Sequence, residues 1–449
     1  MMNNVKYLIQ ELKAWTDEGI IDSGTAAKIA TRYAYAEMKS VAWSRIILTS
    51  IGALLVGLGV IALLAANWDD ISRPARTIIS FMPLGLCVSA YIVGLRKGFT
   101  SRGFLEPLGI FWGLSIGAGI SLIAQTYHIS GDPESFALSW TLLLLPILYA
   151  TQAVAPFVGY YIGLLTWASL TQFSNGITVL YWPLALLAVP VLMIVRKDNP
   201  LSIRTGLMVW GAALCSTAAI GVTLEKTLPG LWMIIYSGAF ATMLLVGITY
   251  ESKDETILQT PLRTLGGCGL AILLYLLIFK WPWDEIGWNH YHTDIDYNST
   301  LAYFDYLLAC MLPILASLML IVVNRQVQSS TWKGLKVISI WTAWGIAPVV
   351  VAGAYIVAAS LDHEFIASII ITLYLTGLSV GTLAEGLIRR TMLLVNAGVL
   401  IAISIILGKF FSSDLGFTTK GIAFIVSGAL FFLVNSYVGR YLRKEEKVS

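Results

Sequence analysis

The sequence predicts an all-α fold: a polytopic transmembrane helix bundle of about 14 spans, with a small N-terminal helical hairpin on the cytoplasmic side. Of the 449 residues, 57% are hydrophobic and only 12% are charged, whereas about a quarter of an ordinary soluble domain is charged. Apolar runs of membrane-spanning length follow one another along most of the chain. In addition, 23 of the 29 Lys and Arg residues fall in every second gap between these runs. A soluble globular fold is thereby excluded.

Each span is predicted from one apolar run, because a helix needs about 20 mostly apolar residues to cross the hydrocarbon core. Lipid offers the backbone no hydrogen-bond partner, so each run must be helical. The weakest division separates the fourth and fifth runs at Thr151 to Ala155. Because the stretches at Arg96 and Arg196 are both basic, an even number of spans must lie between them, and two spans there instead of four would leave twelve as the alternative total. The fourteen runs begin near Arg45, Pro74, Phe104, Ser135, Val154, Asn175, Ser202, Gly230, Leu262, Leu301, Leu335, His363, Arg389 and Thr418.

The distribution of basic residues predicts the orientation, because Lys and Arg concentrate in cytoplasmic loops. With the N-terminus inside, the C-terminus is also cytoplasmic, and the basic clusters keep their parity from Arg96 to Lys447. A miscounted span would invert every later loop. The six basic residues that fall outside are Arg73, Arg76, Lys226, Lys280, Lys409 and Lys420.

The cytoplasmic head, residues 1–42, is predicted to be a helical hairpin. Its first helix ends at Gly19, and Asp22 or Ser23 caps the second. A hairpin this small buries little core alone, so we expect it to dock on cytoplasmic loops or on a cytoplasmic partner. Its apolar positions recur at helical spacing: Val5, Leu8, Ile9, Leu12 and Trp15 in the first helix, and Ala26, Ile29, Ala30 and Tyr33 in the second.

The rest of the chain is predicted to contain an N-terminal transmembrane module (43–170), the remaining transmembrane bundle (171–441) and a cytoplasmic tail (442–449). The first module contains a weak parallel repeat, a device that some transporters use. At an offset of 60 residues, Gly57, Gly59, Leu63 and Trp68 align with Gly117, Gly119, Ile123 and His128.

Four segments carry a resemblance to a known family: WTDEGIID (Trp15 to Asp22), AANWDDISRPAR (Ala65 to Arg76), AQTYHISGDP (Ala124 to Pro133) and the tail from Gly421 to Lys444. Together they are similar to a bacterial polytopic membrane family catalogued as domain of unknown function 2157. The resemblance implies the fold and a bacterial inner (cytoplasmic) membrane. It implies no catalytic residues.

Polar side chains gather at the outer ends of the first and third spans and form the candidate substrate site. Helix capping and interfacial anchoring are the structural alternative for such residues. Arginine and aspartate side chains beside a histidine would suit an anionic or sugar-bearing substrate. The candidate residues are Asp69, Arg73, Arg76, Tyr127, His128 and Asp132.

A weaker alternative is a metal site in the outer loop after the ninth run. His290, His292, Asp294 and Asp296 occupy every second position, so an extended strand would project all four to one side. Imidazole and carboxylate groups can bind a divalent cation, but a solvated acidic loop explains the same pattern. We therefore expect neither a metal nor another cofactor.

Several activities are disfavoured by the remaining motifs. Proton-coupled or ion-coupled carriers keep ionisable residues deep in the bundle, whereas Glu106, Asp305 and Glu385 lie near span ends. The segments GLSIG (Gly113 to Gly117) and GLSVG (Gly377 to Gly381) match a serine nucleophile pattern, yet they also match helix-packing faces. No phosphate-binding loop or basic stripe predicts nucleotide or nucleic-acid binding.

Three hypotheses for function remain. The first is a carrier or flippase-like protein for an envelope-related or amphiphilic substrate, with the candidate site as its mouth. The second is a membrane-embedded transferase acting on a lipid-linked donor, with outer carboxylates as base or metal ligands. The third is a non-enzymatic scaffold or sensor whose head recruits a cytoplasmic partner. Membrane lipids are expected neighbours in all three.

Overall fold

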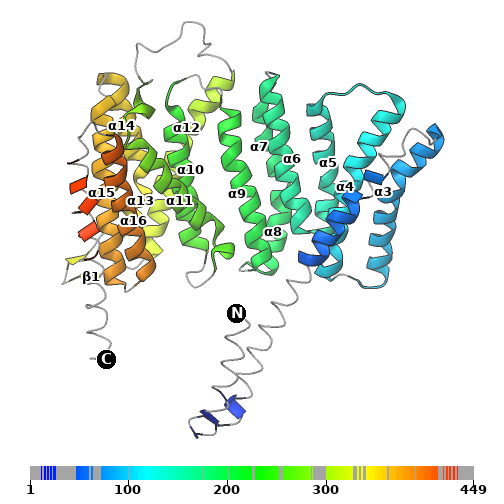
Figure 1. The fold of residues 1–449 in the computed structure, drawn as a ribbon, viewed down its shortest axis with the longest axis horizontal. Helices are drawn as coiled ribbons and strands as arrows, with labels where there is room; N and C mark the ends of the chain where they lie inside the picture. Colours follow the sequence, from blue (N-terminus) through cyan, green and yellow to red (C-terminus); the bar gives the residue numbers. More distant parts are fainter. Residues whose placement is uncertain are drawn as a thin grey trace. The chain divides into compact units, whose positions relative to one another are not determined.

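The structure is a computed structural model, and its helices form two compact units (Figure 1). Unit 1 contains Met1–Leu170 and Pro183–Met193, and unit 2 contains Thr171–Trp182 and Ile194–Ser449. The described residues are 47–59, 72–99, 101–174, 176–200, 202–224, 228–251, 256–284, 286, 300–326, 340–361, 364–389 and 391–412, with 12, 15, 16, 18, 19, 21, 22, 24–26, 62, 63, 331, 332, 335, 336, 418, 421, 422, 424, 425, 428, 429 and 432.

The predicted all-α membrane bundle is confirmed. Among the described residues, eleven helices are long and apolar enough to span a membrane. They are α3 (Arg73–Arg96), α4 (Arg102–Tyr127), α5 (Pro133–Thr151), α6 (Val154–Phe173), the segment Thr178–Asp198, α9 (Ile203–Thr223), α10 (Leu231–Tyr250), Ala302–Asn324 within α12 (Thr300–Gln326), the segment Ile340–Ser360, α15 (Glu364–Ile388) and α16 (Met392–Ser412).

Two of the predicted spans correspond to shorter apolar helices, Ile47–Gly59 and α11 (Pro261–Leu277). The short helices η3 (Ile257–Gln259) and η4 (Trp281–Trp283) flank α11. The run predicted from Thr418 falls largely outside the described residues, as does most of the head. Within the described part of the head, Gly19 has φ +72° and the Thr25 amide donates to the Asp22 carboxylate at 2.9 Å. These two features are consistent with the predicted stop and cap.

The apolar run predicted from Leu335 becomes helical only at Ile340. The reason is a minimal antiparallel pair of strands, β1 (Thr331–Trp332) and β2 (Leu335–Lys336). In its register Thr331 faces Lys336 and Trp332 faces Leu335. The backbone of Leu335 therefore belongs to a strand rather than to the following span.

In unit 1, small residues let neighbouring helices approach closely. A Cβ added to Gly109 of α4 would lie 2.7 Å from Pro156 Cγ of α6, and one added to Gly113 would lie 3.0 Å from Leu144 of α5. One added to Gly117 would overlap the Trp140 ring. The GLSIG segment therefore serves as a packing face, as small residues do between membrane helices.

In unit 2, α10 lies at the centre. In its most apolar window 67% of the residues are buried, against 17% for α12. It packs against α11, α12 and α14 (Ala347–Leu361). Its contact with α11 is close at Gly266, where an added Cβ would lie 2.7 Å from the Phe240 carbonyl oxygen. An all-round apolar helix is expected in such an enclosed position.

Two spans are interrupted. The segment Thr178–Asp198 consists of η2 (Thr178–Leu180), α7 (Tyr181–Leu186) and α8 (Val189–Asp198). The segment Ile340–Ser360 consists of α13 (Ile340–Gly345) followed by α14. In both, proline is the second residue of the later helix, at Pro190 and Pro348. Proline has no amide hydrogen, so each interruption leaves backbone carbonyls that need other partners.

Candidate functional site

We call the end of unit 1 that carries Tyr127, His128 and Asp132 the His128 end. The opposite end carries Arg96 and Arg102 and is the basic end. At the His128 end the start of α3 meets the end of α4, because the Thr77 and Tyr127 hydroxyls lie 3.0 Å apart. Thr77 also donates to the Arg73 carbonyl oxygen at 3.1 Å. The structure thus brings Tyr127 beside the first turn of α3, which carries Arg73 and Arg76.

The other candidates at this end lie at helix termini, except for Asp69, which is outside the described residues. His128 is the C-terminal cap of α4, in the left-handed region at φ 54°, with an exposed side chain. Asp132 is the N-terminal cap of α5: its carboxylate accepts hydrogen bonds from the Ser135 amide at 2.6 Å and hydroxyl at 2.9 Å. Asp132 therefore has the capping role that was the structural alternative.

The cap gives Asp132 a testable pH dependence. The Ser135 amide and hydroxyl hold the pKa of Asp132 below its ordinary value. The stabilisation is therefore complete above the unfolded-state pKa of about 3.9 and is lost as the pH falls through the lower folded-state pKa. Asparagine also caps helices but does not titrate. We expect the melting temperature to fall less steeply below pH about 4 in Asp132→Asn than in the wild type; parallel profiles would refute this role.

The buried carboxylate Glu106 caps a neighbouring helix. Its side chain is 6% exposed, and its oxygens accept from the Val154 amide at 2.9 Å and from the Ala155 amide at 3.4 Å. One turn earlier, Arg102 donates to the Thr151 carbonyl oxygen at 3.0 Å. Two charged side chains of α4 thus satisfy the end of α5 and the start of α6, where unpaired groups would be costly in a membrane.

Charged side chains in unit 2 have similar roles. Glu251 accepts from the amides of Leu262 at 2.9 Å and Arg263 at 3.0 Å, which caps the start of α11. Lys409 donates to the Ile278 carbonyl oxygen at 2.5 Å, at the other end of α11. Glu385 pairs with Arg389, one turn later at the end of α15, at 2.5 Å. These groups complete helix ends rather than forming a reactive cluster.

The two serines of the nucleophile patterns also bind backbone. Ser115 donates to the Phe111 carbonyl oxygen at 2.7 Å, and Ser379 to that of Gly398 at 2.8 Å. His290, His292, Asp294 and Asp296 lie outside the described residues. Within the described part of the chain, no group of three or more His, Cys, Asp or Glu side chains could hold a metal ion.

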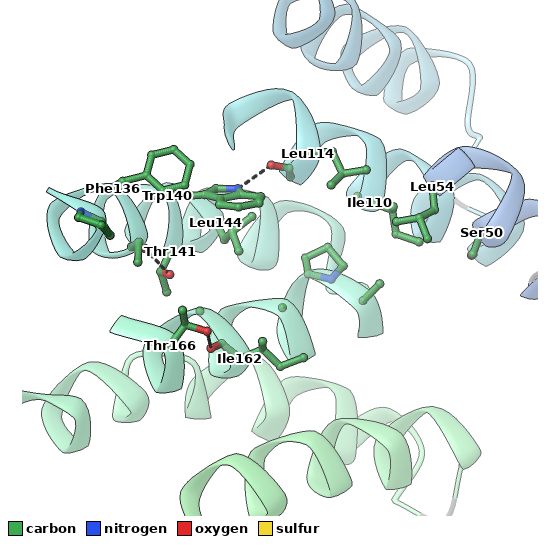
Figure 2. A pocket seen from close by; sticks show the side chains of 18 of the residues that line it. Ser50, Leu54, Ile110, Leu114, Phe136, Trp140, Thr141, Leu144, Ile162 and Thr166 are labelled. Atoms are coloured by element: carbon green, nitrogen blue, oxygen red, sulfur yellow. Dashed lines mark hydrogen bonds between the residues drawn. The ribbon is translucent and has the colours of Figure 1, made fainter. Parts of the chain in front are cut away.

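Unit 1 contains an apolar groove of about 630 Å³ among helix Ile47–Gly59, α4, α5 and α6 (Figure 2). This volume falls within the range of about 300–1,000 Å³ that is usual for ligand pockets. The lining residues are Ser50, Ile51, Leu54, Gly109, Ile110, Gly113, Leu114, Pro133, Phe136, Ala137, Trp140, Thr141, Leu144, Ala155, Pro156, Gly159, Ile162, Gly163, Thr166 and Leu170.

Three of the polar side chains that line the groove are already paired within the protein. Figure 2 shows the Trp140 indole donating to the Gly113 carbonyl oxygen, at 2.8 Å. Thr141 and Thr166 donate to carbonyl oxygens one turn earlier in their own helices, at 2.7 and 2.9 Å. The groove therefore presents a surface that suits an apolar ligand.

The groove is long and open along one side. On α6 it extends from Ala155 to Leu170, about 22 Å at 1.5 Å per residue. Ile51, Leu54 and Ile162 remain 49%, 40% and 52% exposed. Such dimensions fit an extended hydrocarbon chain better than a compact solute. The sequence reasoning did not find this groove, although small residues recur every four positions at Ala155, Gly159 and Gly163.

Together, the helices and the apolar surfaces define a polytopic helical membrane protein. Residues 13–157 match the model of a family described as "Predicted membrane protein (DUF2157)", which confirms the resemblance over that part of the chain. The matched segment includes α3, α4, α5 and the start of α6, and with them most of the groove. No curated protein and no solved structure matches the chain.

Proposed function

We propose that this protein is a carrier for an amphiphilic, envelope-related substrate whose apolar chain lies in the groove of unit 1. The groove is the observation that carries the proposal, because it combines an apolar lining with a length of about 22 Å. A hydrocarbon core is about 30 Å thick, so a lipid chain in the groove would extend through most of it.

The His128 end supports an anionic headgroup for this substrate. The groove reaches Pro133, the residue after Asp132, so a chain bound there would leave its headgroup beside the loop 128–132. The same end carries Arg73, Arg76 and His128, all predicted from the sequence as site residues. Arginine binds phosphate and carboxylate groups through paired hydrogen bonds. A lipid with an anionic headgroup would therefore place its apolar chain in the groove and its headgroup beside these three side chains.

The proposal includes the orientation that the basic residues predict. Both termini are then cytoplasmic, the membrane is the inner membrane of a bacterium, and the His128 end faces outward. In this orientation the substrate headgroup would be bound from the outer leaflet.

Filling the groove should weaken binding without unfolding the protein. A Cβ at Gly159 would meet only Leu144, at 3.9 Å, so Gly159→Leu places a side chain in open groove space. The matched control is Gly85→Leu, on α3 of the same unit, where an added Cβ meets nothing within 4 Å. We expect Gly159→Leu to weaken binding of a fluorescent single-chain phospholipid at least about tenfold, measured by titration of purified protein. The control should bind like the wild type.

Equal binding in both variants and the wild type would show that the groove is a packing crevice. That result would favour the scaffold hypothesis, which predicts instead that deleting residues 1–42 abolishes function. A transferase would additionally require a reactive cluster, and the described carboxylates with known contacts serve as helix caps or in ion pairs.

A further inference from the structure

The interruption between α7 and α8 lies close to the middle of a 21-residue apolar span. Because Pro190 has no amide hydrogen, the Leu186 carbonyl oxygen loses its helical donor. The following amide does not restore the helical pattern, since Val191 donates to Ala188 at 3.2 Å instead of to Leu187. Before the break, Leu187 and Ala188 donate to Leu184 and Ala185, three residues earlier, at 3.0 and 3.3 Å. The regular hydrogen-bond ladder is thus absent where lipid would penalise unpaired backbone most.

Three tyrosine hydroxyls donate to the carbonyl oxygens of this interruption. Tyr160 donates to Leu184 at 2.7 Å and Tyr161 donates to Ala185 at 3.1 Å, both from α6. Tyr149, from α5, donates to Leu187 at 2.7 Å. The side chains of Tyr160 and Tyr161 are fully buried. Three side chains on two neighbouring helices therefore bind three of the four carbonyl oxygens from Leu184 to Leu187.

The helix that supplies two of these tyrosines is also a wall of the groove. Gly159, Ile162, Gly163 and Thr166 line the groove, and their spacing places them on one face of α6. Tyr160 and Tyr161 hold the break in α7–α8 from the same helix. A change in the angle at the break would thus act on α6 through these two hydrogen bonds.

We propose that the break at Leu187–Ala188 is the hinge of unit 1 and that the Tyr160 and Tyr161 hydroxyls act as a latch, because their hydrogen bonds hold the backbone of the hinge in one conformation. Loss of these two hydrogen bonds then moves α6 and releases the chain bound in the groove. Hinges are short segments where a few backbone angles absorb a large motion, and interrupted helices provide such segments in transporters. The release step rests on the proposed function, whereas the hinge itself rests on the hydrogen bonds around the break.

The test removes the two tyrosine hydroxyl groups and keeps the aromatic rings. The double variant Tyr160→Phe/Tyr161→Phe loses both hydroxyls, and the matched control is Tyr236→Phe, whose hydroxyl donates to the Thr217 carbonyl oxygen at 3.1 Å within the uninterrupted α9. In lipid nanodiscs, we expect amide hydrogen exchange at 187–192 to become about tenfold faster in the double variant and to stay unchanged in the control. Dissociation of the fluorescent phospholipid should accelerate by a similar factor.

A second variant should act in the opposite direction. Pro190→Ala restores an amide donor for the Leu186 carbonyl oxygen, so exchange at 187–192 and lipid dissociation should both slow. Unchanged exchange in the double variant and in Pro190→Ala would overturn the hinge. Faster exchange with unchanged dissociation would overturn its control of the groove. If the wild type binds no lipid, the proposed function fails, and the exchange measurements still decide the hinge.

Discussion

Replacement of Glu106 with alanine is expected to destabilise unit 1 by about 3 kcal/mol, because it leaves two partly buried amides without the Glu106 acceptor. The amides belong to Val154 and Ala155, the first residues of α6, and both donate to the Glu106 carboxylate. Unpaired backbone groups are costly away from water.

The measurement is the temperature at which half of the purified protein remains monodisperse after heating in detergent. Glu106→Gln is the control, since the amide oxygen still accepts one hydrogen bond and the loss should be roughly half as large. A midpoint for Glu106→Ala equal to that of the wild type would mean that water, rather than the carboxylate, satisfies the start of α6.

Gly266→Ala should have an effect of similar size in unit 2. The added methyl group would lie 2.7 Å from the Phe240 carbonyl oxygen and 2.8 Å from Leu244 Cα. These are backbone atoms of α10, so neither can rotate away, and α10 and α11 must separate along their contact. Forcing an extra carbon into a close-packed interface costs about 1–3 kcal/mol, occasionally more, and we expect the upper end here.

The adjacent residue provides the control for this substitution. A Cβ at Gly267 would meet only the Leu244 side chain, at 3.7 Å, which is ordinary contact. Gly267→Ala should therefore be neutral or slightly stabilising, because alanine favours a helix by about 0.5–1 kcal/mol over glycine. The same heating assay compares the two variants. Equal midpoints would contradict the packing of α10 on α11 described above.

The helices could be predicted from the sequence because hydrophobic length and charge are local properties of the chain. Even the weakest division was placed correctly: α5 ends at Thr151, Gln152 is left-handed at φ 51°, and α6 begins at Val154. The stretches at Arg96 and Arg196 are both basic, so an even number of spans must lie between them. This requirement indicated the break between α5 and α6, although the hydropathy of the region shows little interruption. The run predicted to begin near Leu335 has its helix start at Ile340, because Leu335 and Lys336 pair with the neighbouring Trp332 and Thr331 and hydropathy does not reveal such a short hairpin.

The candidate site could be predicted only in part. Polar residues at span ends are visible in the sequence, and Arg73, Tyr127, His128 and Asp132 do lie together at one end of unit 1. Asp132 caps its own helix through Ser135, three residues later, and helix capping was the structural alternative from the sequence. The cap of α6 by Glu106 is tertiary, since Val154 lies 48 residues away, and it required the structure. The groove also required it, because its lining comes from four helices and consists of residues that are ordinary in any membrane span.

The charged caps also impose an order on biosynthesis. A chain enters the membrane from its N-terminus as it is made, and Glu106 precedes its partner Val154 by 48 residues. The α5–α6 hairpin therefore meets a ready acceptor when it leaves the translocon. The end of α11 has the reverse arrangement, since Ile278 is bound by Lys409, which follows 131 residues later. The cap of α6 in unit 1 can therefore form during synthesis, whereas the end of α11 in unit 2 has no contact with Lys409 until that residue has been made.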